Sequence, residues 1–154
     1  MKKTYDEEAK KLANAIDIAL DAFEQYPVKG LTPDQRNMMI NSYLEFRHSA
    51  LNPLPQYKKL ASLKYLITDV FIYFNEATGD TVEYFWKQIH LNNLDYQREN
   101  KLLKILKRQK IKDRIEYEYV TDIMVHYHQQ GLISDEELLQ IQKMIEAFEN
   151  KRIV

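Results

Sequence analysis

The chain has no cysteine among its 154 residues, only three glycines and four prolines. The lack of thiols excludes a disulfide framework, a thiolate nucleophile and a cysteine-based zinc site. With so few glycines and prolines, a 45% hydrophobic and 12% aromatic composition excludes a disordered chain. What remains is a folded protein, long enough to bury a core without a covalent or metal staple.

The chain also has no large excess of positive or negative charge. The formal net charge is -1 and the isoelectric point is near 6.4. Such a balance creates no overall field toward nucleic acid, an anionic membrane or a basic partner. Any recognition by charge must therefore be local.

Long apolar runs are also absent. The densest run, residues 70–74, is too short to span a bilayer, and residues 1–8 turn acidic where a secretory signal would need its apolar stretch. We therefore expect a soluble, cytoplasmic protein with no membrane contact.

Apolar residues recur at spacings of three and four along most of the chain, which predicts amphipathic helices. Helix start and stop signals divide the pattern into six or seven helices. They begin near residues 5, 33, 60, 80, 94, 114 and 135. The fold class predicted is all-α, an irregular bundle of short-to-medium amphipathic helices in a single domain over residues 1–154.

Capping signals mark several of these starts. Thr4 with Glu7, and Thr32 with Gln35, have the capping-box spacing, and Asp113 is followed by Glu116 in the same way. Residues 134–137 open the last helix. Two connectors, 109–113 and 130–135, each place an aliphatic residue in a turn before an acidic helix start.

The helix predicted over residues 60–74 keeps a heptad spacing of apolar residues and is expected to be the most buried. Its inner positions are Leu60, Leu63, Ile67, Val70 and Phe74. We expect this helix at the centre of the core.

The helix that starts near residue 114 is predicted to face inward with five residues: Ile115, Tyr119, Val120, Ile123 and Tyr127. Residues 115–119 also alternate with period two, so a short strand is the alternative there.

Few residues suggest chemistry. Glu45 and His48 share a helix face with the spacing that di-iron bundles use, but no second copy follows. Asp122 and His126 are four residues apart, while His128 points to another side of the helix. We expect no metal, no cofactor and no catalytic residue.

Aromatic residues are frequent, with 11 tyrosines. The runs 71–74 and 84–86 encircle more of their helices than one core face needs. Their rings would therefore either meet another chain or pack between helices on both sides.

The strongest local signal is a basic segment over residues 98–114, where cations far outnumber anions. This segment could bind phosphate groups or the acidic surface of a protein. It could also be simply the solvated side of a helix, with its charges neutralised by the acidic residues of the last helix. The candidate partner-binding residues are Arg98, Lys101, Lys104, Lys107, Arg108 and Lys110.

Together these features favour a small cytoplasmic protein-binding domain of the adaptor, regulatory or toxin-neutralising type, without catalytic activity. A nucleic-acid-binding regulator that uses the basic segment is the alternative, and a metal-dependent enzyme is a further one. The partner expected first is a protein, then a nucleic acid, and the oligomeric state is left open.

Overall fold

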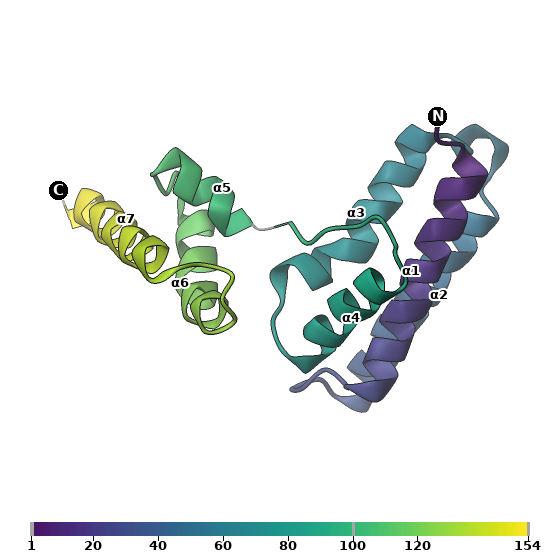
Figure 1. Cartoon of the computed structure of the whole chain (residues 1–154), viewed down its shortest axis with the longest axis horizontal. Helices are drawn as coiled ribbons and strands as arrows, with labels where there is room; N and C mark the ends of the chain where they lie inside the picture. Colours follow the sequence, from purple (N-terminus) through teal and green to yellow (C-terminus); the bar gives the residue numbers. More distant parts are fainter. Residues whose placement is uncertain (1, 100, 154) are drawn as a thin grey trace. The chain divides into compact units, whose positions relative to one another are not determined.

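The computed structural model describes residues 2–99 and 101–153, without the side chains of the last two. These residues form seven α-helices and one short 3₁₀-helix, η1, and no strand among them (Figure 1), which confirms the all-α fold. The elements are α1 (Tyr5–Gln25), α2 (Pro33–Leu51), η1 (Pro55–Tyr57), α3 (Leu60–Glu76), α4 (Asp80–Leu91), α5 (Lys101–Arg108), α6 (Arg114–Gln129) and α7 (Asp135–Ile153).

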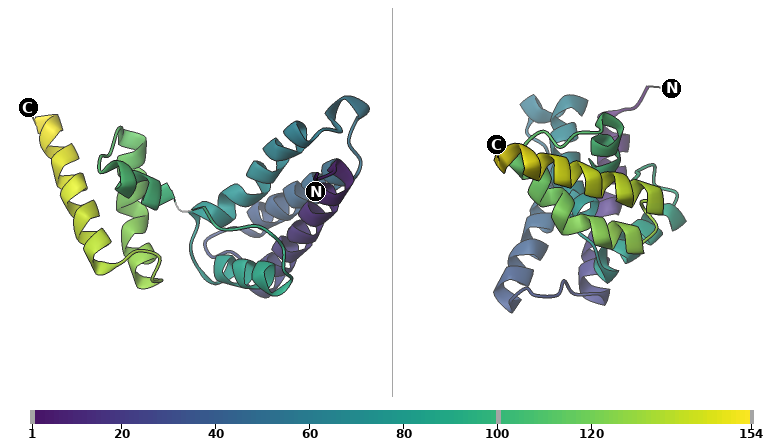
Figure 2. Two further views of the ribbon diagram at one scale, coloured as in Figure 1. Left: turned by 45° about the horizontal axis from the view of Figure 1, so that its top comes forward. Right: turned by 90° about the vertical axis from the view of Figure 1, so that its left-hand side faces the viewer.

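The helices group into two compact units, residues 1–98 and 99–154. The buried apolar side chains fall into two clusters, one in each unit. In unit 1, α1 and α2 run antiparallel and side by side, and in unit 2, α6 and α7 form a helical hairpin (Figures 1 and 2). The single domain expected over residues 1–154 stays a prediction.

Helix α1 is the central element of unit 1, because it packs against α2, α3 and α4. Five of its eight buried side chains are alanines. These are Ala9, Ala13, Ala15, Ala19 and Ala22. Since alanine adds little beyond the backbone, the neighbouring helices can approach α1 closely.

Aromatic rings fill the space that the alanines leave. Phe74 of α3 is fully buried, with its ring centroid 3.7 Å from that of Phe85 and 5.6 Å from that of Phe23. The indole of Trp86 donates a hydrogen bond to the Phe74 carbonyl at 2.8 Å. The two aromatic runs of the sequence therefore place their rings in or against the core of unit 1.

The expectation that residues 60–74 form the most buried helix is wrong. Helix α3 buries four residues and α1 buries eight. Leu63, Val70 and Phe74 face inward as predicted, but Ile67 is half-buried at the edge of the cluster and Leu60 is exposed. The heptad pattern identified the inner face correctly, but α1 ranks first because three helices cover it.

The helix starts match the capping signals. The hydroxyls of Thr4 and Thr32 accept hydrogen bonds from the third residue of their helices, and the Asp113 carboxylate does the same for α6. At Thr32 the box is reciprocal, because the Gln35 side chain accepts from the Thr32 amide at 2.9 Å. A reciprocal box also joins Ser134 and Glu137 before α7.

The fifth helix is shorter than predicted, since α5 begins at Lys101 and residues 94–99 form no helix. Asn93 adopts a left-handed conformation with φ 54°, which ends the preceding helix and turns the chain. Leu94 and Tyr96 then pack on the core of unit 1, while the intervening side chains are exposed. The alternation of apolar and polar residues was present in the sequence, but the segment is not a strand, because the Tyr96 amide donates to the Leu94 carbonyl at 2.9 Å and closes a tight turn.

Unit 2 contains the two connectors with a buried aliphatic residue, as predicted. Ile111 is 4% exposed and Ile133 is 3% exposed. The segment 115–119 lies in α6, so the strand alternative is wrong. Ile115 is also not inward-facing but 80% exposed, because it precedes Val120 by five residues and so lies about 140° around the helix.

Within the described ranges, no helix combines the length and the apolar character that crossing a membrane requires.

Replacing Phe74 with alanine should lower the free energy of unfolding of unit 1 by about 3–5 kcal/mol, because the lost ring leaves a cavity between Phe23 and Phe85. Urea unfolding followed by Trp86 fluorescence measures this. The control is Ile72→Ala on the same helix, where the side chain is 50% exposed and the change should be small. Equal losses in both variants would contradict the assigned core.

Removing the Thr32 hydroxyl tests the reciprocal capping box. Thr32→Ala should cost about 1 kcal/mol, whereas Thr32→Ser should cost far less because it keeps the acceptor for the Gln35 amide. The same fluorescence titration measures both variants. A serine variant as unstable as the alanine variant would show that the methyl group of Thr32, and not the cap, is what matters.

Candidate functional site

The structure distributes the six candidate residues over different surroundings. Arg98 belongs to the non-helical segment before α5, where it is half-buried and donates to the Ala77 carbonyl at 2.7 Å. Lys101, Lys104 and Lys107 lie on the exposed side of α5, opposite a buried leucine and isoleucine face. The candidates therefore do not form one helical stripe, because Arg98 lies in unit 1 and outside α5.

Arg108 is engaged within unit 2. Its guanidinium pairs with the Glu116 carboxylate through two hydrogen bonds of 2.7 and 3.0 Å. The Lys112 amide donates to the same carboxylate at 2.9 Å. The hydrogen bond from Arg108 holds the pKa of the Glu116 carboxyl below its ordinary value, with the Lys112 amide acting in the same direction against the effect of burial. The carboxylate that pairs with Arg108 thus comes from α6 rather than from the last helix.

Other cations gather around a hollow of about 260 Å³ in unit 2. Its apolar floor consists of Ile111, Met144, Ala147 and Phe148. Lys110, Lys143 and Lys151 line it as well, and none of these three forms an ion pair with another described residue. We call this set of lysines and floor residues the basic hollow.

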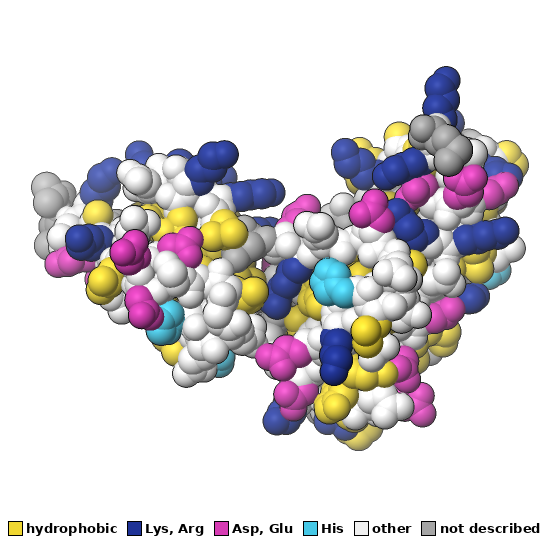
Figure 3. Space-filling model, in the orientation of Figure 1, with side chains coloured by type: hydrophobic (Ala, Val, Ile, Leu, Met, Phe, Trp, Pro, Cys, Tyr) yellow, Lys and Arg dark blue, Asp and Glu magenta, His cyan; other side chains and the backbone are white. Residues whose placement is uncertain are grey.

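Basic and acidic side chains are unevenly distributed over the face of unit 2 that Figure 3 shows. In Figure 3 the Lys and Arg side chains gather along the upper edge of unit 2, and the Asp and Glu side chains lie lower on the same face. Within α7 the acidic residues Asp135, Glu136 and Glu137 fill the first turn, and Lys143 and Lys151 lie further along the helix, with Glu146 and Glu149 between them in the sequence. The last helix therefore contributes two lysines to the basic hollow and carries acidic residues both in its first turn and between those lysines.

Sequence reasoning missed Lys143 and Lys151. Their signal was the spacing of Lys143, Ala147 and Lys151, which places all three on one face of a helix. Nothing local, however, connects that face to the turn that carries Lys110 and Ile111.

The residues considered for metal or acid–base chemistry lie on two different helices, Glu45 and His48 on α2 and Asp122 and His126 on α6. Glu45 and His48 are both exposed, and His48 shares a 3.3 Å contact with Asn52. His128, not His126, has a carboxylate partner, Asp135. Over the described residues, no group of three or more His, Asp or Glu side chains is arranged to hold a metal ion.

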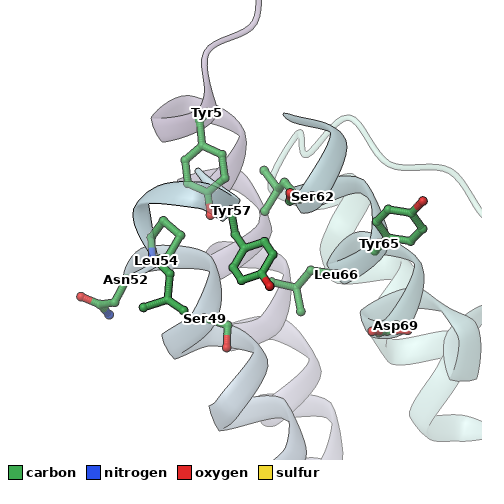
Figure 4. A pocket seen from close by; sticks show the side chains of 11 residues that line it. Tyr5, Ser49, Asn52, Leu54, Tyr57, Ser62, Tyr65, Leu66 and Asp69 are labelled. Atoms are coloured by element: carbon green, nitrogen blue, oxygen red, sulfur yellow. The ribbon is translucent and has the colours of Figure 1, made fainter. Parts of the chain in front are cut away.

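A second hollow, of about 530 Å³, lies in unit 1 at the end of α2, around η1 and along α3. We call it the tyrosine groove, because Tyr5, Tyr57 and Tyr65 line it together with Leu54 and Leu66 (Figure 4). Ser49, Asn52, Pro53, Ser62, Leu63 and Asp69 complete the lining. The Tyr5 hydroxyl donates to the Ala50 carbonyl at 2.9 Å and so ties the start of α1 to the end of α2.

No model of a known protein family, no curated protein and no solved structure matches this chain.

The Arg108–Glu116 pair predicts how the stability of unit 2 depends on pH. A carboxyl whose pKa is lower in the folded state stabilises the fold above its unfolded value, here 4.5, and this contribution is lost as the pH falls through the folded value. Glu116→Gln should therefore be destabilising near neutral pH, with the difference from wild type shrinking under acid conditions.

Urea titrations at about pH 6 and about pH 3, followed by the amide NMR signals of Val120 and Ile123, measure this difference. The control is Glu118→Gln, since Glu118 pairs with Arg114 on an exposed surface. A pH-independent loss in the Glu116 variant would show that its carboxylate charge contributes nothing.

Proposed function

We propose that the chain is a protein-binding protein that acts without catalysis of its own, and that unit 2 recognises an acidic segment of its partner. The observation that carries the proposal is the basic hollow, which three lysines without an ion pair to any described residue line together with apolar residues. The cytoplasmic location expected from the sequence belongs to the same proposal.

Electrostatics favours an acidic ligand. Lys110, Lys143 and Lys151 have no acidic partner among the described residues, and neither have Lys104 and Lys107 of α5. Like charges gathered on one surface repel one another, and a ligand carrying carboxylates relieves that repulsion while it speeds the encounter.

The floor favours a protein over a nucleic acid. Ala147 is exposed and Phe148 is half-buried, so these two residues supply most of the apolar surface that a ligand could reach in the hollow, while Met144 is only 9% exposed. Such a floor takes a leucine or phenylalanine side chain of an acidic segment, so apolar contact and charge act together. Phosphate contacts alone would leave the floor uncovered.

The test is the triple variant Lys110→Glu, Lys143→Glu, Lys151→Glu, probed with a fluorescent peptide of alternating glutamate and leucine. Binding of this peptide should weaken at least about tenfold in the variant, because each exchange replaces an attraction by a repulsion. Fluorescence polarisation gives the affinities, and far-UV circular dichroism checks that the helices persist.

The matched control is Lys10→Glu, Lys29→Glu, Lys87→Glu, three exposed lysines of unit 1 that change the net charge equally. It should bind nearly as wild type. A peptide of glutamate alone tests the apolar contact and should bind more weakly than the glutamate–leucine peptide. A single-stranded oligonucleotide tests whether the hollow prefers a nucleic acid. An oligonucleotide that binds more tightly than the peptide, or a triple variant that binds the peptide normally, would overturn the proposal.

A further inference from the structure

The tyrosine groove of unit 1 differs in chemistry from the basic hollow. We propose that it binds an extended, proline-containing peptide segment of a partner, with a basic side chain of that segment paired to Asp69. This site is independent of the one proposed for unit 2.

The groove leaves large apolar side chains uncovered. Leu54, Tyr57 and Tyr65 are 59%, 57% and 78% exposed. In Figure 4 the Tyr57 ring lies between Leu54 on one side and Leu66 of α3 on the other. Tyr65, also on α3, lies to the right of Leu66 in this view. Spaced aromatic rings on an open surface are the feature that proline rings pack against in grooves for polyproline-type segments.

Several hydroxyl groups of the groove have no hydrogen-bond partner among the described residues. The hydroxyls of Tyr57, Tyr65 and Ser62 form no hydrogen bond with any described residue, and the same holds for Ser49. Other hydroxyls on the same helices do bond to the preceding turn: Ser42 donates to the Met38 carbonyl and Thr68 to the Lys64 carbonyl.

These free hydroxyls favour an extended ligand over a helical one. A polyproline-type backbone has no internal hydrogen bonds, so its carbonyls need donors from the surface that binds it. A helical ligand satisfies its own carbonyls and would leave the hydroxyls without use. The hydroxyl groups and the tyrosine rings of the groove therefore both favour an extended, proline-containing segment.

Asp69 supplies charge complementarity. It lies one helical turn after Tyr65 on α3, lines the groove and forms no ion pair with another residue in the described part of the chain. An arginine or lysine of the ligand would pair with this carboxylate and lie near the Tyr65 ring, whose face also attracts a cation.

The test is a selection from a displayed library of random twelve-residue peptides on the full chain. Retained peptides should contain prolines and an arginine or lysine. Their affinity, measured by fluorescence polarisation, should fall about tenfold in Tyr57→Ala, because this ring lies in the middle of the groove. Tyr57 is in a short, exposed element, so its truncation leaves the core intact.

A charge reversal gives a second measurement. Selection on Asp69→Lys should retain peptides with an acidic residue in place of the basic one. Two controls must keep binding the original peptides: Met38→Ala, an exposed apolar residue of α2 outside the groove, and the triple lysine variant of the basic hollow. Because the triple lysine variant alters only the basic hollow, peptide binding to it tests the tyrosine groove independently of the function proposed for unit 2.

Three outcomes would overturn the proposal. Retained peptides that lack proline and form helices would assign the groove to a helical partner. Self-association that sedimentation detects in wild type and not in Tyr57→Ala would assign it to a second copy of the chain. An empty selection, or peptides that bind Tyr57→Ala as well as wild type, would show that the groove takes no peptide.

Discussion

The packing of α1 is the constraint on which unit 1 depends. Its alanines bring α2, α3 and α4 close to its backbone, and the large rings of those helices, such as Phe74 and Phe85, pack with the few large side chains of α1, among them Phe23. The pattern changes at the N-terminal end of α1. There Tyr5, not an alanine, meets the end of α2, and the tyrosine groove opens beside it.

Features encoded by neighbouring residues were predictable from the sequence. A capping box such as that of Thr32 and Gln35 is closed within one turn, so spacing alone locates the helix start. The order of burial was not predictable in this way. A heptad in residues 60–74 shows which face is apolar, but which helix becomes central depends on how many others cover it, and that is decided by tertiary packing. The missed non-helical segment had a local signal, the alternation of apolar and polar residues around Leu94 and Tyr96, which does not fit the period of a helix.

The candidate sites show the same division. Composition revealed the basic segment, but it could not separate Arg98 and Arg108, which are used inside their units, from Lys110, which is not. Lys143 joins the basic surface only because α7 returns past the turn after α5. The tyrosine groove was invisible for the same reason, since the start of α1, the end of α2 and α3 contribute to it from distant parts of the chain.

The two hollows differ in the force that would hold a ligand, and this difference separates them in solution. Binding at exposed lysines depends on screened Coulomb attraction and weakens as salt is added. Burial of proline and tyrosine rings depends on apolar contact, which added salt does not screen. Only the single ion pair at Asp69 would be salt-sensitive in the tyrosine groove, against three or more charges at the basic hollow. Ionic strength therefore tells which hollow a newly found partner uses before any residue is changed.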